Sequence, residues 1–175
     1  MALVQDRPGV LNRVASMFRR RGFNISSLAV GHSETQGLSR MTFVVDGDDH
    51  TVEQMTKQLY KLIDVVKVSD ISKEDVVLRE LALIKVRTTP STRPEILQLV
   101  GIFRSDVVDV SPDSVIIEVT GDEDKVDSLL RILRPFGVRE VMRTGRVGLM
   151  RGMAKSLAVE DTSRSAGRSK GNGAG

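Results

Sequence analysis

Residues 2–33 of this chain read ALVQDRPGVLNRVASMFRRRGFNISSLAVGHS. The short apolar run Ala2–Val4 predicts a strand, and the turn residues Asp6–Gly9 follow it. Apolar residues then recur at positions 10, 11, 14, 15 and 18, which is the spacing of one helix face, so a helix is predicted over Val10–Arg21. Alternating residues over Ile25–Ser33 predict a second strand.

The following residues complete one α+β unit. Arg40–Val45 is rich in strand-forming residues and is predicted to pair with Ile25–Ser33 as a hairpin. A second helix is predicted over Thr51–Leu62, and Val65–Ile71 is predicted to be the closing strand. The element order is therefore βαββαβ.

The same order of elements then repeats. Its predicted members are the strands Leu78–Arg87, Val107–Val110, Val115–Val119 and Val138–Met142 and the helices Arg93–Phe103 and Glu123–Leu133, the last ended by Pro135–Gly137. Two copies predict an α+β fold with two tandem ferredoxin-like domains. The expected boundaries are residues 1–72 for the first domain, 73–76 for a linker, 77–152 for the second domain and 153–175 for a disordered tail without periodicity.

Composition excludes several classes of protein. The chain has 175 residues and no cysteine, so disulfides, thiolate metal sites and cysteine nucleophiles are ruled out. The net charge of +3 comes from residues 151–175, with five basic and two acidic residues, and residues 1–150 are neutral. No apolar run has the length of a membrane span and no signal segment is recognisable, so a cytoplasmic location without membrane contact is expected.

Catalytic motifs are also absent from the sequence. There is no glycine-rich phosphate loop, and both histidines, His32 and His50, stand at polar positions where they are expected to be solvated. Carboxylates such as Asp48 and Asp122 stand where helices begin, which the helix dipole explains. We therefore expect no catalytic site and no metal site on this chain.

The loop between the first strand and the first helix is suited to a free amino acid. The N–H groups of Val10 and Leu11 lack helical partners and can bind a carboxylate, and Gly9 permits close approach. Asp6 can bind an ammonium group, and Asn24 offers amide hydrogen bonds. In a purely structural alternative, Asp6 caps the helix and Asn24 adopts the left-handed conformation. Spacing alone favours this structural alternative.

Several motifs resemble one known family. They are Asp6-x-Pro-Gly-Val-Leu, Arg-Gly-Phe-Asn-Ile at 21–25, Leu-Ser-Arg-Met-Thr at 38–42 and Arg-Glu-Leu-Ala-Leu-Ile-Lys-Val at 79–86. Together they resemble the small subunit of acetolactate synthase, also called acetohydroxyacid synthase, whose first domain is an ACT domain. The resemblance extends in order over residues 2–152.

This resemblance implies a regulatory subunit of branched-chain amino acid biosynthesis. Such a chain would form a homodimer through its ACT domains, activate the catalytic large subunit and make it sensitive to valine. Thiamine diphosphate, Mg²⁺ and FAD would belong to the catalytic subunit, with no cofactor on this chain. The resemblance places valine between two chains, with Asp6, Gly9 and Asn12 from one, Asn24 and Ile25 from the other, and Gly31 near the ligand's side chain.

Two departures from the family pattern stand out. Relatives commonly have Asn in place of Asp6 and carry more residues before the stretch that matches Leu3. The second repeat has Thr88–Ser91 in place of the Asp-x-Pro-Gly loop, so no valine site is assigned there, and that repeat is expected to support activation or association.

Two alternatives stay open in the sequence. Tandem ferredoxin-like units also occur in RNA-binding modules, but these need aromatic residues on the central strands, which Met41–Val44 supplies poorly. Arg19–Arg21 is interpreted as a solvated helix end favoured by the dipole rather than as a contact to the catalytic subunit.

Overall fold

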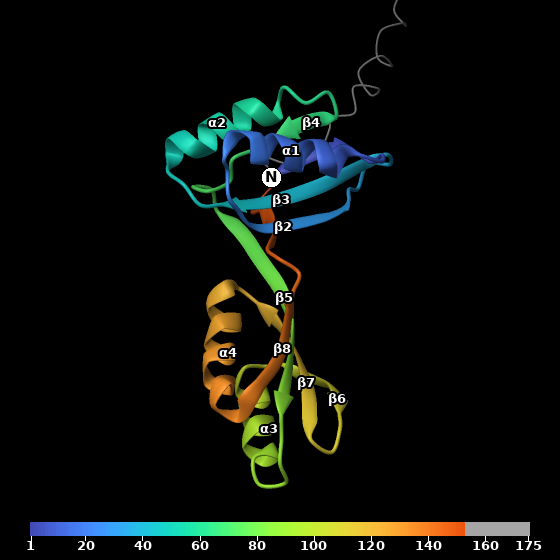
Figure 1. Cartoon of the computed structure of the whole chain (residues 1–175). Coiled ribbons are helices and arrows are strands. Elements are labelled where there is room, and N and C mark those ends of the chain that lie inside the picture. The colour runs from blue at the N-terminus through green and yellow to red at the C-terminus, as the bar shows by residue number, and fades with distance from the viewer. Residues whose placement is uncertain (153–175) are drawn as a thin grey trace, which may run out of the picture.

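The computed structural model describes residues 1–152, which form two units joined by long strands (Figure 1). The predicted tail at 153–175 lies outside the described residues. In the first unit the elements are β1 (Ala2–Gln5), α1 (Val10–Arg21), β2 (Ile25–His32), β3 (Leu38–Val45), α2 (Asp49–Leu59) and β4 (Val65–Val68). Its strands form an antiparallel sheet in the order β2-β3-β1-β4, with β2 and β4 at the edges.

The second unit repeats this topology. Its elements are β5 (Val76–Arg87), α3 (Arg93–Ile102), β6 (Asp106–Val110), β7 (Ser114–Gly121), α4 (Glu123–Gly137) and β8 (Val138–Arg143). The strand order β6-β7-β5-β8 is equivalent to that of the first unit. The predicted fold class, α+β with tandem ferredoxin-like units, is therefore confirmed.

Each unit buries its own apolar core between its sheet and its helices. In the first, Phe18 of α1 is buried, with its ring stacked 5.2 Å from that of Phe43 on β3. In the second, alternate residues of β5, Ala82, Ile84 and Val86, are fully buried beneath α3 and α4. Burying each large aliphatic or aromatic side chain contributes about 1.5–3 kcal/mol, so two cores of this kind support two separate units.

Several predicted boundaries were wrong. Helix α4 continues through Pro135 to Gly137, because its lost hydrogen bond to the Arg131 carbonyl falls on an exposed side of the helix. Helix α2 starts earlier than predicted and ends at Leu59, where Tyr60–Leu62 form tight turns. Strand β4 ends at Val68 rather than Ile71, because its partner β1 begins opposite this residue.

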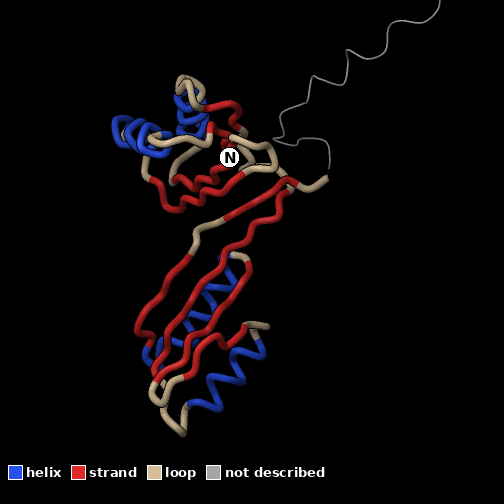
Figure 2. The backbone as a smooth tube through the Cα atoms, turned by 90° about the vertical axis from the view of Figure 1, so that its right-hand side faces the viewer, coloured by secondary structure: helices blue, strands red, loops and turns tan. Residues whose placement is uncertain are grey.

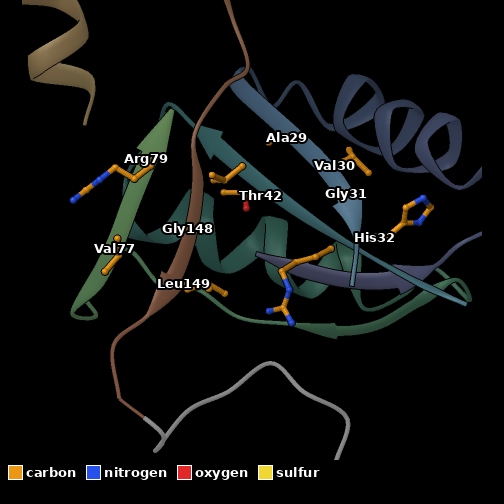
Figure 3. Close-up of a pocket in the computed structure, with 11 residues that line it drawn as sticks. Ala29, Val30, Gly31, His32, Thr42, Val77, Arg79, Gly148 and Leu149 are labelled. Atoms are coloured by element: carbon orange, nitrogen blue, oxygen red, sulfur yellow. The ribbon is translucent and has the colours of Figure 1, made fainter. Parts of the chain in front are cut away.

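A ninth strand, β9 (Val147–Met150), was not predicted. It pairs with the first four residues of β5, Val76–Arg79, while the rest of β5 lies in the second sheet. Strand β5 thus starts at the last residue of the expected 73–76 linker and runs without a break between the units (Figure 2). The β5–β9 ribbon lies against the face of the first sheet that the helices leave uncovered (Figure 3).

The turn before β9 joins the two units through polar contacts. The backbone N–H of Arg146 donates to the Oγ of Ser27 on β2, at 2.9 Å. The Arg146 guanidinium forms an ion pair of 2.9 Å with Glu123, at the start of α4. One residue therefore contacts the edge strand of the first unit and a helix of the second.

Candidate functional site

The loop from Asp6 to Gly9 leads into a helix end that no side chain caps. Gly9 is the N-cap of α1, with φ +85° and ψ −8°, and the first turn contains no acidic residue. The Val10 N–H has only a long contact of 3.4 Å to the Arg7 carbonyl. Since a helix N-terminus carries partial positive charge, this end can bind an anion.

Asp6 does not cap α1, so that part of the structural alternative is wrong. Its backbone N–H donates to the Gly37 carbonyl at 2.8 Å, which holds the loop against the turn after β2. Its carboxylate lies 3.0 Å from Nδ1 of His32, the last residue of β2. Asp6 therefore presents a partly exposed carboxylate beside the open end of the helix.

His32 is exposed, as predicted, but the sequence analysis missed its contact with Asp6. Strands β1 and β2 both pair antiparallel with β3, so they run parallel to each other and end at the same side of the sheet. Gln5 faces Leu38 and His32 faces Ser39 in these ladders. The predicted hairpin of β2 and β3 supplied half of this information, and the other half is the pairing of β1 with β3, which was not predicted.

Asp64 and two arginines form an ion-pair cluster next to the loop that the sequence analysis also missed. The Asp64 carboxylate accepts hydrogen bonds from Arg7 at 2.6 and 2.9 Å and from Arg13 at 2.5 Å. Its pKa is held below the ordinary value, chiefly by the hydrogen bond from Arg13 and also by Arg7. Asp64 directly precedes β4. Its ion pairs therefore fix the loop, through Arg7, and α1, through Arg13, to the start of that strand.

Asn24 and Ile25 lie at the opposite end of α1 from Asp6 and Gly9. Helix α1 has 12 residues and is therefore about 18 Å long. Asn24 is exposed, and its Nδ2 donates to Asp46 at 3.0 Å. It is not left-handed, since Arg104 is the sole non-glycine residue with positive φ among residues 1–152. One chain therefore does not bring the two predicted halves of the site together.

The remaining predicted residues divide between two places. Leu11 and Asn12 are exposed in the first turn of α1, beside the loop. Gly31 lines a cavity of 380 Å³ between β2, β3 and the β5–β9 ribbon (Figure 3). A Cβ built on Gly31 meets no atom within 4 Å, so this position has free space around it.

Comparisons with known protein families match both units. The family "AHAS small subunit-like ACT domain" matches residues 1–67, and the family "Small subunit of acetolactate synthase" matches residues 79–152. The chain belongs to the acetolactate synthase small-subunit family. This assignment confirms the resemblance seen in the sequence and favours it over the RNA-binding alternative.

Individual members of the family are similar over nearly their whole length. The chain is 58% identical over 153 residues to the probable acetolactate synthase small subunit of Archaeoglobus fulgidus, covering 87% of this chain and 96% of that protein. It is 49% identical over 160 residues to the small subunit of Bacillus subtilis, covering 91% and 93%. The crystal structure of the Thermotoga maritima small subunit is 51% identical, with a TM-score of 0.81 over 87% of this chain and 95% of that one.

Two further features concern membranes and metals. Within residues 1–152 no helix has both the length and the apolar character needed to cross a membrane. Within the same residues, no group of three or more histidine, aspartate or glutamate side chains is placed to hold a metal ion.

Proposed function

We propose that this chain is the regulatory subunit of an acetolactate synthase in branched-chain amino acid biosynthesis. It binds the catalytic subunit, raises its activity, and inhibits it when valine binds between two copies of the first domain. Its membership of the small-subunit family supports a catalytic partner. The observation that carries the proposal is the division of the candidate site between the two ends of α1.

A symmetric dimer would reunite the two halves. Strand β2 is an edge strand, and its exposed side can pair with β2 of a second copy. An antiparallel pairing about a two-fold axis sets the two α1 helices side by side in opposite directions. The N-terminal end of one α1 then faces the C-terminal end of the other, so that Asp6 and Gly9 of one chain approach Asn24 and Ile25 of its partner.

The groups at this junction complement an amino acid. The ligand carboxylate is bound by the N–H groups at the start of α1, whose first turn offers no competing acidic side chain. The ligand ammonium is bound by Asp6, which exchanges its contact with His32 for the ligand. Asn24 exchanges its bond to Asp46 for the ligand.

Regulation follows from a site made by two chains. A ligand that contacts both chains stabilises one dimer geometry over others, and the catalytic subunit responds to that geometry. The catalytic subunit carries thiamine diphosphate, Mg²⁺ and FAD and converts pyruvate to 2-acetolactate and CO₂. This chain contributes no catalytic group, and the reaction takes place in the cytoplasm.

Calorimetric titration of L-valine into the purified chain tests the proposal. Asp6→Ala and Asn24→Ala should each abolish binding and relieve valine inhibition in the reconstituted enzyme. Asp113→Ala, which removes an exposed ion pair in the second unit, serves as the matched control and should bind valine normally. Full valine sensitivity in both site variants would refute the site.

Mixing the two site variants tests whether the site is shared between chains. A heterodimer of Asp6→Ala and Asn24→Ala chains contains one intact site and one doubly altered site. After subunit exchange, roughly a quarter of the wild-type number of sites should return. If mixing restores no binding although the subunits exchange, each site lies within one chain.

A further inference from the structure

Asp64 is a buried charged residue at a position where three segments meet. Its side chain is 2% exposed, although it carries a full negative charge at neutral pH. Its backbone carbonyl accepts from the N–H of Gln5, at the end of β1, at 2.8 Å. A carboxylate that is shielded from water in this way requires compensating partners, and Arg7 and Arg13 provide them.

One of these partners lies within the loop of the candidate site, and the other lies just after it. Arg7 lies between Asp6 and Gly9 in the sequence, and Arg13 lies one helical turn after Gly9. The Arg13 Nη1 is 3.3 Å from the position that a Cβ on Gly9 would occupy, so the guanidinium packs against the Gly9 backbone. Both arginines are about half exposed, and each is held at its inner side by Asp64.

We propose that Asp64 is a positioning residue that holds the Asp6–Gly9 loop in the shape that binds the effector. It acts through Arg7 and Arg13 and does not itself touch the ligand. The inference rests on the proposed function for its effect on valine. Its structural part, the ordering of the loop, stands independently of the ligand.

The physical basis is preorganisation. The open N–H groups of α1 and the Asp6 carboxylate must face the two charged ends of one amino acid at the same time, so their relative position sets the affinity. The loop has no side-chain cap to hold it. In its place it has the Asp6 N–H bond to Gly37 and the two arginine links to Asp64. Loss of the Asp64 charge frees both guanidiniums together.

Valine titration of the dimer is the first test. Asp64→Asn should weaken valine binding at least about tenfold. Arg13→Gln, which leaves Asp64 paired with Arg7, should also weaken it, and the double variant should bind no more weakly than Asp64→Asn alone. Asp113→Asn, which breaks an Arg–Asp pair away from the loop, should bind as the wild type does. Wild-type affinity in Asp64→Asn, or additive effects in the double variant, would overturn the proposal.

Hydrogen–deuterium exchange without ligand provides the second test and separates the two hypotheses. Amides over residues 6–12 should exchange faster in Asp64→Asn and in Arg13→Gln than in the wild type or Asp113→Asn. Equal exchange in these variants would overturn the positioning role even if valine binds. If the wild type binds no valine, either alone or with the catalytic subunit, the proposed function is refuted instead. The exchange data would still decide the role of Asp64.

Discussion

Gly9 lies in the left-handed region of backbone conformation and also in contact with Arg13, so two separate constraints act on one residue. A side chain at this position would be strained by the positive φ, and it would also press on a guanidinium 3.3 Å away. Gly37 has a similar φ of +80°, but a Cβ there would meet no atom within 4 Å. The two glycines therefore allow the constraints to be measured separately.

Replacing Gly9 with alanine should reduce stability and valine binding together. The positive φ should cost about 1–2 kcal/mol in both Gly9→Ala and Gly37→Ala, measured by urea unfolding. Gly9→Ala alone should also weaken valine binding, because its Cβ displaces Arg13 from the loop. Equal valine affinities in the two variants would show that the contact with Arg13 has no effect on the site.

At the scale of single elements, the second helices of the two units, α2 and α4, begin in the same way. Asp48 accepts from the Thr51 N–H at 2.8 Å at the start of α2, and Asp122 accepts from the Lys125 N–H at 2.9 Å at the start of α4. Helices α1 and α3 have no side-chain cap of this kind. Both second helices are thus capped by an aspartate. The first helices differ, because α1 is open whereas α3 follows a turn in which the Thr92 N–H donates to the Thr89 hydroxyl and the Arg93 N–H to the Thr89 carbonyl.

Asp48→Ala should lower the melting temperature by a few degrees at neutral pH. Hydrogen bonds from the Thr51 hydroxyl and N–H hold the pKa of Asp48 below its ordinary 3.8. Because the folded-state pKa is the lower one, the cap stabilises fully above pH 3.8 and its effect is lost as the pH falls through the folded-state value.

Thermal unfolding of three proteins over a pH series checks this prediction. The difference between the wild type and Asp48→Ala should shrink below pH 3.8. Asp48→Asn retains an acceptor oxygen and should stay close to the wild type at neutral pH. A difference between wild type and Asp48→Ala that does not change with pH would mean that the carboxylate charge plays no part in the cap.

At the scale of the whole molecule, strand β5 and the turn at Gly145–Arg146 determine how the two units are joined. Strand β5 belongs to both the β5–β9 ribbon and the second sheet. Gly145 has φ +80°, and a Cβ there would lie 2.8 Å from the Ser27 Oγ and 3.1 Å from the Leu28 carbonyl. The turn therefore approaches β2 closely, on the strand proposed to form the dimer.

Gly145→Ala should separate the unfolding of the two units. The substitution pushes the turn away from β2, which removes the Ser27–Arg146 bond and loosens the Arg146–Glu123 link. Overpacking of this kind typically costs about 1–3 kcal/mol, in addition to the φ strain that it shares with Gly37→Ala. Calorimetry should show a broader or split transition in Gly145→Ala and not in Gly37→Ala. An equal effect in both variants would show that the contact with β2 does not couple the units.

Much of the fold could be predicted because its signals are local. The helical spacing of Val10–Arg21 and the alternation of Ile25–Ser33 each depend on which side of an element is buried, and neighbouring residues record this. Repetition of the pattern then predicted the second unit. The errors in the strands β4 and β9 occurred where distant pairing overrode local signals, as in β9, which becomes a strand through its partner β5.

The sequence by itself determined the two βαββαβ units, the open loop before α1 and the family to which the chain belongs, since these depend on local periodicity and on motifs. Only the tertiary structure decided that Asp64 meets Arg13, 51 residues away, that His32 meets Asp6, and that Asn24 lies at the far end of α1 from the loop. Such contacts depend on strand register and chain reversal, which bring together residues whose local sequences contain no information about each other.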